Sequence, residues 1–266
     1  METGLGRFIT LTTDFGLSDH YVGAMKGAAL SVCPDATLVD ITHDITAQDV
    51  LEGALELAAA YRYFPAGTVF VAVVDPGVGS NRKGIAAAAG DHFFVAPDNG
   101  LLTLVLQQHP ESMVVELTDP QYARATISRT FEGRDRFAPA AAWLACGTPI
   151  ASLGTALSSY QRIEIPSPRV TPDAVVGVVL RVDRFGNLIT NLDRETVERF
   201  GPAAELRVTA GSHNVGAVIA TYADAPLAEV CALFGSTDRL EIAVNRGSAA
   251  ALLSLAREAP VVVTRT

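Results

Sequence analysis

The stretch FITLTTDFG, residues 8–16, decides the fold of the first part of this 266-residue chain. Its first six residues are apolar, aromatic or β-branched, and a turn with aspartate and glycine follows them. The same pattern returns in TLVDIT (37–42) and in TVFVAVVD (68–75). Continuous runs of this kind are typical of strands that are buried on both faces of a sheet. We therefore predict three buried strands.

Two amphipathic helices are predicted between these strands. Their apolar residues recur at helical spacing: Val22, Met25, Ala29 and Val32 in the first gap, and Val50, Ala54, Leu57 and Tyr61 in the second. Thr46 and Asp49 are placed as a capping pair for the second helix. Strands that alternate with helices predict a parallel sheet of the α/β class.

The rest of the chain divides at a proline-rich segment. Before it, strands are predicted at GIAAAA, HFFVAP and MVVEL, with helices from Leu101 and through APAAAWLACG. The segment IPSPRVTPDA (165–174) holds three prolines and is interpreted as a linker. After it come short strands at close spacing, which predict a compact β-rich domain. We expect an α/β domain at 1–165, a linker at 166–174 and a β-rich domain at 175–266.

Composition excludes several classes of partner. The formal net charge of −9 opposes binding to phosphate backbones and anionic lipid, so neither nucleic acid nor a membrane surface is expected. The start of the chain lacks the pattern of a signal peptide, and no apolar run approaches the ~18 residues of a membrane span. Three widely separated cysteines suggest thiols in a reducing compartment. We expect a soluble cytoplasmic protein, and the five histidines form no metal-binding motif.

Polar residues directly after buried strands are the first candidates for a site, because ligands of parallel sheets bind at that edge. Asp14 follows the first strand and either accepts hydrogen bonds from a ribose diol or caps the next helix. Asp75 opens the turn DPGVGSNR and either faces a ligand or forms an Asx-turn. Arg82 either reaches back to Asp75 or is a surface arginine.

Two further segments leave a choice open. TFEGRDRFAP (130–139) places Glu132 among charged residues, as a wall that faces a substrate or as a solvated helix start. DRFGNLITN (183–191) places Asp183, Asn187 and Asn191 around a glycine turn that can equally be a polar hairpin. The motifs GxGxxG, GxxxxGKS and GxSxG are all missing.

Taken in order, these segments resemble the S-adenosylmethionine (SAM) hydroxide adenosyltransferase family, which is related to fluorinase and chlorinase. The matching stretches are TLTTDFGLSDHYVGAMKG, VDITHDI, VFVAVVDPGVGS, FVAPDNGLL, TFEGRDRFAP, RVDRFGNLITN, TYADA and LEIAVNRGSAA. The resemblance implies a Rossmann-like N-terminal α/β domain, a smaller C-terminal β-barrel-like domain, and a homotrimer with substrate sites at subunit interfaces. No cofactor is implied.

The resemblance also implies residue roles. Asp14 is expected to hold the ribose, and Asp183 and Ser236 to meet the amino and carboxylate groups of methionine. The adenine pocket is expected from Asn187, Tyr222 and the backbone around Arg246, and Asn245 is also expected to bind substrate. Asp75 and Arg82 match two residues that order the attacking water, and Glu132 stands where the family has a histidine.

The reaction that the resemblance implies is hydrolysis of SAM to adenosine and methionine. Halogenating relatives carry an inserted loop after the third strand and lack an aspartate at the position of Asp75, whereas this connection is short. Two alternatives stay open: a SAM-dependent halide adenosyltransferase, and a SAM-binding protein without turnover because of Glu132.

Overall fold

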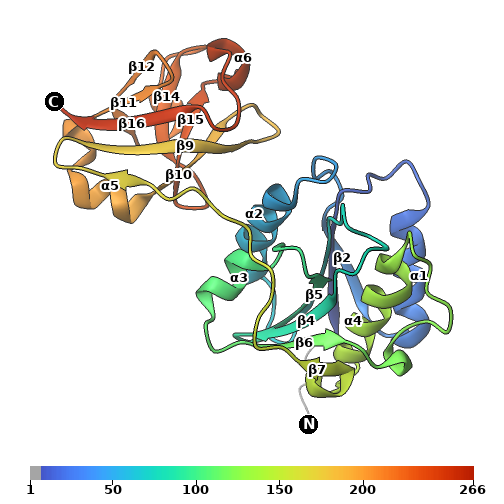
Figure 1. Ribbon diagram of the computed structural model, residues 1–266. Coiled ribbons are helices and arrows are strands. Elements are labelled where there is room, and N and C mark those ends of the chain that lie inside the picture. The colour runs from blue at the N-terminus through green and yellow to red at the C-terminus, as the bar shows by residue number, and fades with distance from the viewer. Residues whose placement is uncertain (1–6) are drawn as a thin grey trace, which may run out of the picture. The chain divides into compact units, whose positions relative to one another are not determined.

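The structure, a computed structural model, describes residues 7–266 and consists of two compact units (Figure 1). The first ends at Glu164 and the second spans Ile165–Thr266. The segment predicted as a linker includes the short strand β8 (Arg169–Val170). The domain boundaries given by the sequence stay a prediction.

The first unit is an α/β layer structure around a seven-stranded sheet, counted over the described residues. Its strands, in the order of the sheet, are β2 (Thr37–Thr42), β1 (Phe8–Thr13), β3 (Val69–Val73), β5 (His92–Pro97), β4 (Gly84–Ala89), β6 (Met113–Leu117) and β7 (Gly154–Ala156). The first four in this order run parallel to one another. The remaining pairings are antiparallel.

The antiparallel part departs from the parallel sheet that the first three strands predicted. Only Gly90 and Asp91 separate β4 from β5. Two residues can reverse the chain into a hairpin, but a parallel crossover needs a much longer connection. Gly90 has a φ of +56°, in the left-handed region that glycine enters without strain.

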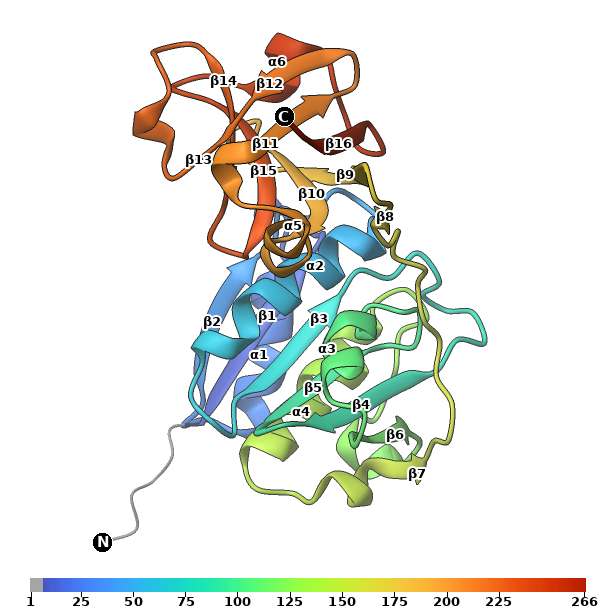
Figure 2. The ribbon, with the colours of Figure 1, turned by 90° about the vertical axis from the view of Figure 1, so that its left-hand side faces the viewer.

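Two pairs of helices cover the two faces of this sheet (Figures 1 and 2). α1 (Tyr21–Val32) and α4 (Ala138–Ala145) pack on one face, in the core that contains Ile9 and Leu11. α2 (Val50–Ala60) and α3 (Thr103–Gln108) pack on the other, in the core that contains Phe70 and Phe94. Burial of each such large side chain contributes about 1.5–3 kcal/mol.

The start of α2 is capped much as its sequence suggested. Asp49 Oδ1 accepts a hydrogen bond from the backbone N–H of Glu52 at 3.0 Å. Glu52 reaches back, and its Oε2 accepts from the N–H of Thr46 at 3.0 Å. Asp49 is therefore a capping residue as predicted, while Thr46 takes part through its backbone rather than its side chain.

The second unit is built from short strands that form a barrel-like sheet. Along the sheet they are β12 (His213–Gly216), β11 (Leu206–Ala210), β16 (Pro260–Arg265), β9 (Ala174–Val182), β10 (Leu188–Asp193), β15 (Arg239–Val244), β14 (Val230–Phe234) and β13 (Val218–Ile219), with β8 beside β9. β12 also lies against β14, which brings the two ends of this order together. Two short helices, α5 (Arg194–Phe200) and α6 (Ala249–Leu253), complete the unit.

Three observations on the whole chain bear on the sequence expectations. None of the helices in the described residues has both the length and the apolar character that crossing a bilayer requires. Cys33, Cys146 and Cys231 are free thiols, and Cys146 is exposed rather than buried. The second core includes Val179 from β9, Leu188 from β10 and Ile242 from β15.

Candidate active site

Asp14 and Asp75 lie at the same edge of the first sheet because neighbouring parallel strands carry them. Thr13 at the end of β1 pairs with Val73 at the end of β3, and the two aspartates follow within two residues. This is the edge at which parallel α/β sheets bind ligands. The sequence expectation that strand ends gather polar residues holds here.

Asp14 does not cap the helix that follows it. α1 begins at Tyr21, and its N-cap residue is His20. Asp14 Oδ2 instead accepts a hydrogen bond from the backbone N–H of Gln48 at 2.8 Å. The carboxylate therefore keeps acceptor capacity for a ligand such as a diol.

Asp75 and Arg82 form a buried pair at the end of β3. Arg82 Nε donates to both carboxylate oxygens of Asp75 at 3.0 Å, and its Nη2 donates to Oδ2. The two side chains are 5% and 9% exposed, which excludes the interpretation of Arg82 as a surface arginine. The carboxylate of Asp75 accepts hydrogen bonds from Arg82. The turn that follows Asp75 is held by backbone hydrogen bonds, such as the one that the N–H of Val78 donates to the Asp75 carbonyl.

Glu132 completes this cluster. Arg82 Nη1 donates to Glu132 Oε2 at 3.0 Å, and Arg136 Nε lies 3.5 Å from the same oxygen. Glu132 is only 8% exposed. We call Asp75, Arg82 and Glu132 the carboxylate–arginine cluster. Burial alone would lower the pKa of Arg82. Its hydrogen bonds to Asp75 and Glu132, and the negative charges of these two residues, raise the pKa, so the guanidinium stays protonated.

The local backbone explains how Glu132 is aimed inward. Gly133–Phe137 form one turn of π-helix directly before α4, a rare geometry that is frequent at functional sites. Asp135 in this turn is fully buried and accepts from Arg134 Nε at 2.7 Å and from the N–H of Ser128 at 2.9 Å. The charged residues of TFEGRDRFAP therefore make specific internal contacts and are not a solvated helix start.

A glycine holds the loop that carries Asp75. Gly79 has a φ of +78°, and a Cβ on it would overlap the carbonyl oxygen of Arg129. Arg129 also donates from Nη2 to the Gly79 carbonyl at 3.0 Å. The close approach joins the DPGVGS turn to the segment that leads into Glu132, so both carboxylates are positioned by the same contact.

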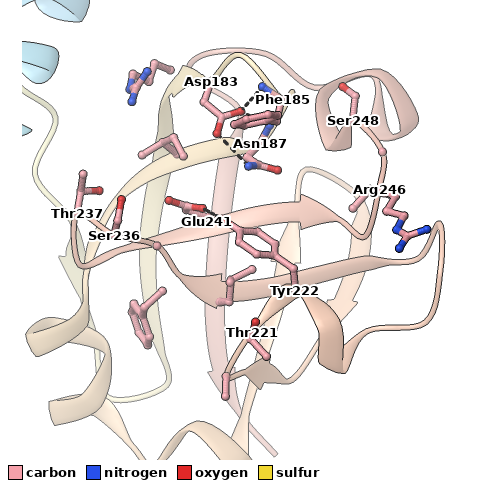
Figure 3. Close-up of a pocket in the computed structure, with 18 residues that line it drawn as sticks. Asp183, Phe185, Asn187, Thr221, Tyr222, Ser236, Thr237, Glu241, Arg246 and Ser248 are labelled. Atoms are coloured by element: carbon pink, nitrogen blue, oxygen red, sulfur yellow. Dashed lines mark hydrogen bonds between the residues drawn. The ribbon is translucent and has the colours of Figure 1, made fainter. Parts of the chain in front are cut away.

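The second unit contains a cavity of about 940 Å³, shown in Figure 3. Asp183, Asn187, Tyr222, Ser236 and Arg246 all line it, from four separate segments of the chain. These are the residues that the sequence analysis assigned to substrate in this unit, with one exception. Asn245 lies outside the set of lining residues, and its Nδ2 donates to the Ala225 carbonyl at 2.7 Å.

Asp183 and Asn187 form the turn between β9 and β10. Asp183 Oδ1 accepts from the N–H groups of Phe185 and Asn187, both at 2.8 Å, and Oδ2 accepts from Asn187 Nδ2 at 2.9 Å. The polar-hairpin interpretation of DRFGNLITN is therefore right for the geometry, and the same hairpin lines the cavity. Asn191 instead bonds the N–H of Val178 and the Pro166 carbonyl.

Besides Arg181, which also lines this cavity, sequence analysis missed a second ionisable residue, Glu241. It lies on β15 between apolar neighbours and is 6% exposed. Glu241 Oε2 accepts from the Tyr222 hydroxyl at 2.7 Å, and the two groups face each other in Figure 3. A signal was present, since RLEIAV sets one carboxylate in a strand whose other central residues are apolar.

Comparison with known proteins gives the family. The model of the SAM hydroxide adenosyltransferase N-terminal domain matches residues 9–154, and that of the C-terminal domain matches residues 177–262. An (R)-S-adenosyl-L-methionine hydrolase of Salinispora arenicola is 40% identical over 254 residues, which cover 93% of this chain and 94% of that protein. A fluorinase of Actinoplanes sp. is 32% identical over 220 residues, with 73% and 74% covered.

A solved structure agrees with these matches. The crystal structure of an uncharacterized conserved protein from Thermotoga maritima superposes with a TM-score of 0.92 at 36% identity, covering 97% of this chain and all of that one. The family models together span both units and include every residue of the carboxylate–arginine cluster and of the cavity named above. This chain belongs to the SAM hydroxide adenosyltransferase family.

Proposed function

We propose that this protein hydrolyses SAM to adenosine and L-methionine through attack of water at C5′ of the ribose. The observation that carries the proposal is the carboxylate–arginine cluster at the end of β3, in a chain of this family. The relative from Salinispora arenicola, named as a SAM hydrolase, supports the same reaction.

In this reaction the main task of the protein is to position the nucleophile. The sulfonium of SAM is already an activated leaving group, so displacement by water needs no metal. The water must lie in line with the C5′–S bond and be partly stripped of solvent. Asp75 accepts its hydrogen bond and its proton, while Arg82 fixes the carboxylate. Glu132 holds the second edge of Arg82, in place of the family histidine.

Substrate recognition is assigned to both units. Asp14, at the sheet edge of the first unit, binds the ribose diol. In the cavity of the second unit, Ser236 takes part in binding the methionine end, and Asn187 and Tyr222 take part in binding adenine. The backbone around Arg246, which has a φ of +58°, completes the adenine side.

The decisive experiment is one chromatogram of the products formed from SAM in buffer that contains chloride. Adenosine and methionine in equal amounts are the expected products. A 5′-halo-5′-deoxyadenosine in their place would show a halide adenosyltransferase instead. Tight binding of SAM without any product would show a binding protein.

We propose further that the working protein is a cytoplasmic homotrimer whose subunits combine their residues in shared substrate sites. The family resemblance supports the trimer, and the division of candidate residues between two units is consistent with it. The three free thiols fit a reducing compartment. Sedimentation that shows a stable monomer with full affinity for SAM would rule out the trimer.

A further inference from the structure

The carboxylate–arginine cluster has a second arginine beside it. Asp75 and Glu132 carry two negative charges, and Arg82 places one positive charge between them. Arg136 Nε lies 3.5 Å from Glu132 Oε2, the same oxygen that accepts a hydrogen bond from Arg82 Nη1 at 3.0 Å. With Arg136 included, two negative charges face two positive charges. The charge of the cluster is therefore balanced by Arg136.

Other cations of the same segments are engaged in pairs of their own. Lys83 lies 3.0 Å from Glu116 and forms an ion pair with it. Arg134 donates from Nε to Asp135 at 2.7 Å. The positive charge next to Glu132, besides that of Arg82, is therefore supplied by Arg136.

The local backbone and a glycine give Arg136 its place. The π-helical turn Gly133–Phe137 carries Arg136 four positions after Glu132, and the side chain of Arg136 is 28% exposed. A Cβ on Gly84 would lie 3.1 Å from Arg136 Cδ, so a glycine at the start of β4 leaves room for the aliphatic stem. Arg136 Nη1 donates to the Leu117 carbonyl at 3.4 Å. Its Nε is buried and makes no hydrogen bond within the described residues, so the interaction with Glu132 is one of charge.

We propose that Arg136 is a positioning residue, which balances the charge of Glu132 so that Arg82 stays held against Asp75. The effect on turnover rests on the proposed function. Without Arg136, the full charge of Glu132 would compete with Asp75 for Arg82. The cluster would also carry a net negative charge, which opposes the negative charge that the attacking oxygen acquires as Asp75 takes its proton. Glu132 and Arg136 therefore act as one unit.

The test is a double-substitution cycle on the kcat of adenosine release. Arg136→Met keeps an unbranched side chain beside Gly84 but removes the charge. We expect kcat to fall about 3- to 10-fold with KM unchanged, because Arg136 acts through Glu132 and not on substrate. Added to Glu132→Gln, where the second carboxylate is gone, Arg136→Met should change kcat by less than about 2-fold. Arg136→Lys keeps the charge and should stay within about 3-fold of the parent.

The Glu132→His background reverses the expected sign. This substitution removes the carboxylate and leaves the partly buried charge of Arg136 without its acidic partner. Adding Arg136→Met to Glu132→His should therefore raise kcat by about 2- to 5-fold. One substitution thus lowers kcat beside glutamate and raises it beside histidine. A residue that only stabilised the fold would lower activity in both backgrounds.

The matched control is a pair with the same sequence spacing on the surface. Arg199 pairs with Glu195, also four positions away, and the two side chains are 76% and 73% exposed. An ion pair of this kind contributes little. Arg199→Met, alone or together with Glu195→Gln, should leave kcat unchanged and show no coupling.

The outcomes separate this proposal from the proposed function. An equal fall in kcat on Arg136→Met in all three backgrounds overturns the proposal, and so does an undiminished kcat in the parent background. If Arg136→Met does not fold, Arg136→Gln takes its place in the cycle. If the parent forms no product, the proposed function fails, and the cycle is measured on Tm instead. Arg136→Met should then lower Tm more in the parent than in Glu132→Gln, and an equal lowering would overturn the pairing.

Discussion

The two units use buried carboxylates in opposite ways. In the first, Asp75 and Glu132 share Arg82, so their negative charges are compensated within the protein. In the second, Glu241 has a neutral hydroxyl as its hydrogen-bond partner, and the charges of Asp183 and Arg181 shift its pKa in opposite directions. Carboxylates that are hydrogen-bonded to an arginine hold a fixed geometry, whereas a carboxylate that is bonded to a neutral group keeps acceptor capacity for a ligand.

This difference separates the two tasks of the proposed reaction. A water molecule is small and must be aimed, so the groups around it have to be rigid before substrate arrives. A flexible amino-acid chain carries its own charges, so its site can complete a pair that the protein leaves open. Substitutions in the first cluster should therefore affect turnover, and substitutions at open carboxylates should affect binding.

The largest effect is expected at Asp75. Asp75→Asn keeps the shape of the side chain but removes the base, so kcat should fall by roughly 10²- to 10⁴-fold with little change in KM. Steady-state rates of adenosine release measure both constants. Asp35→Asn, at a side chain that is 87% exposed, is the matched control. Undiminished turnover in Asp75→Asn would remove Asp75 from the mechanism.

Asp14 tests whether the role of a carboxylate depends on its hydrogen-bond partner or on the unit to which it belongs. It belongs to the first unit, yet its carboxylate accepts a hydrogen bond from the neutral N–H of Gln48. Asp14→Ala should therefore resemble a change in the second unit, raising KM about 10- to 100-fold with a smaller effect on kcat.

A second experiment compares SAM with 2′-deoxyribose SAM, which lacks one of the hydroxyls assigned to Asp14. The parent should discriminate against it, and Asp14→Ala should not. A fall in kcat at unchanged KM would instead place Asp14 with the water-positioning residues.

Glu132 is expected to have a moderate effect. Glu132→Gln keeps an oxygen for Arg82 Nη1 but removes one of the two charges on the arginine, so kcat should fall about 3- to 10-fold. Glu132→His restores the residue that the family resemblance places here and should stay within about 10-fold of the parent. Adenosine release again measures the rates.

Glu116→Gln is the control, because Glu116 pairs with Lys83 at 3.0 Å in a more exposed ion pair of the same unit. A surface pair of this kind contributes little, and its loss should leave kcat unchanged. If Glu132→Gln is equally silent, Asp75 alone must hold Arg82 in its catalytic position.

Particular residues show how much of the candidate site can be predicted from the sequence. Asp14 and Asp75 were predictable because a strand end fixes their direction, and the pairing of Thr13 with Val73 then brings them to one edge. Arg82 and Glu132 are 50 positions apart in the sequence, and their contact depends on the Gly79 loop and on a π-helical turn. The periodicity of the sequence predicts neither of these two features. Asn245 matched a motif, but its side chain is used to hold the Ala225 carbonyl.

The smallest effect concerns the stability of the protein without ligand. Burial raises the pKa of Glu241 above its ordinary value of 4.5, so the folded state binds more protons than the unfolded state between those two values. Stability from this group is present at acidic pH and is lost as pH rises through the folded pKa. Glu241→Gln carries no such charge and should be more stable than the parent at neutral pH, by about 1 kcal/mol or a few degrees in Tm.

Calorimetry at several pH values measures this difference, which should shrink as pH falls below about 4. A variant that is less stable than the parent at neutral pH without ligand would show that the Tyr222 bond already compensates the charge, and Glu241 would then be a structural residue.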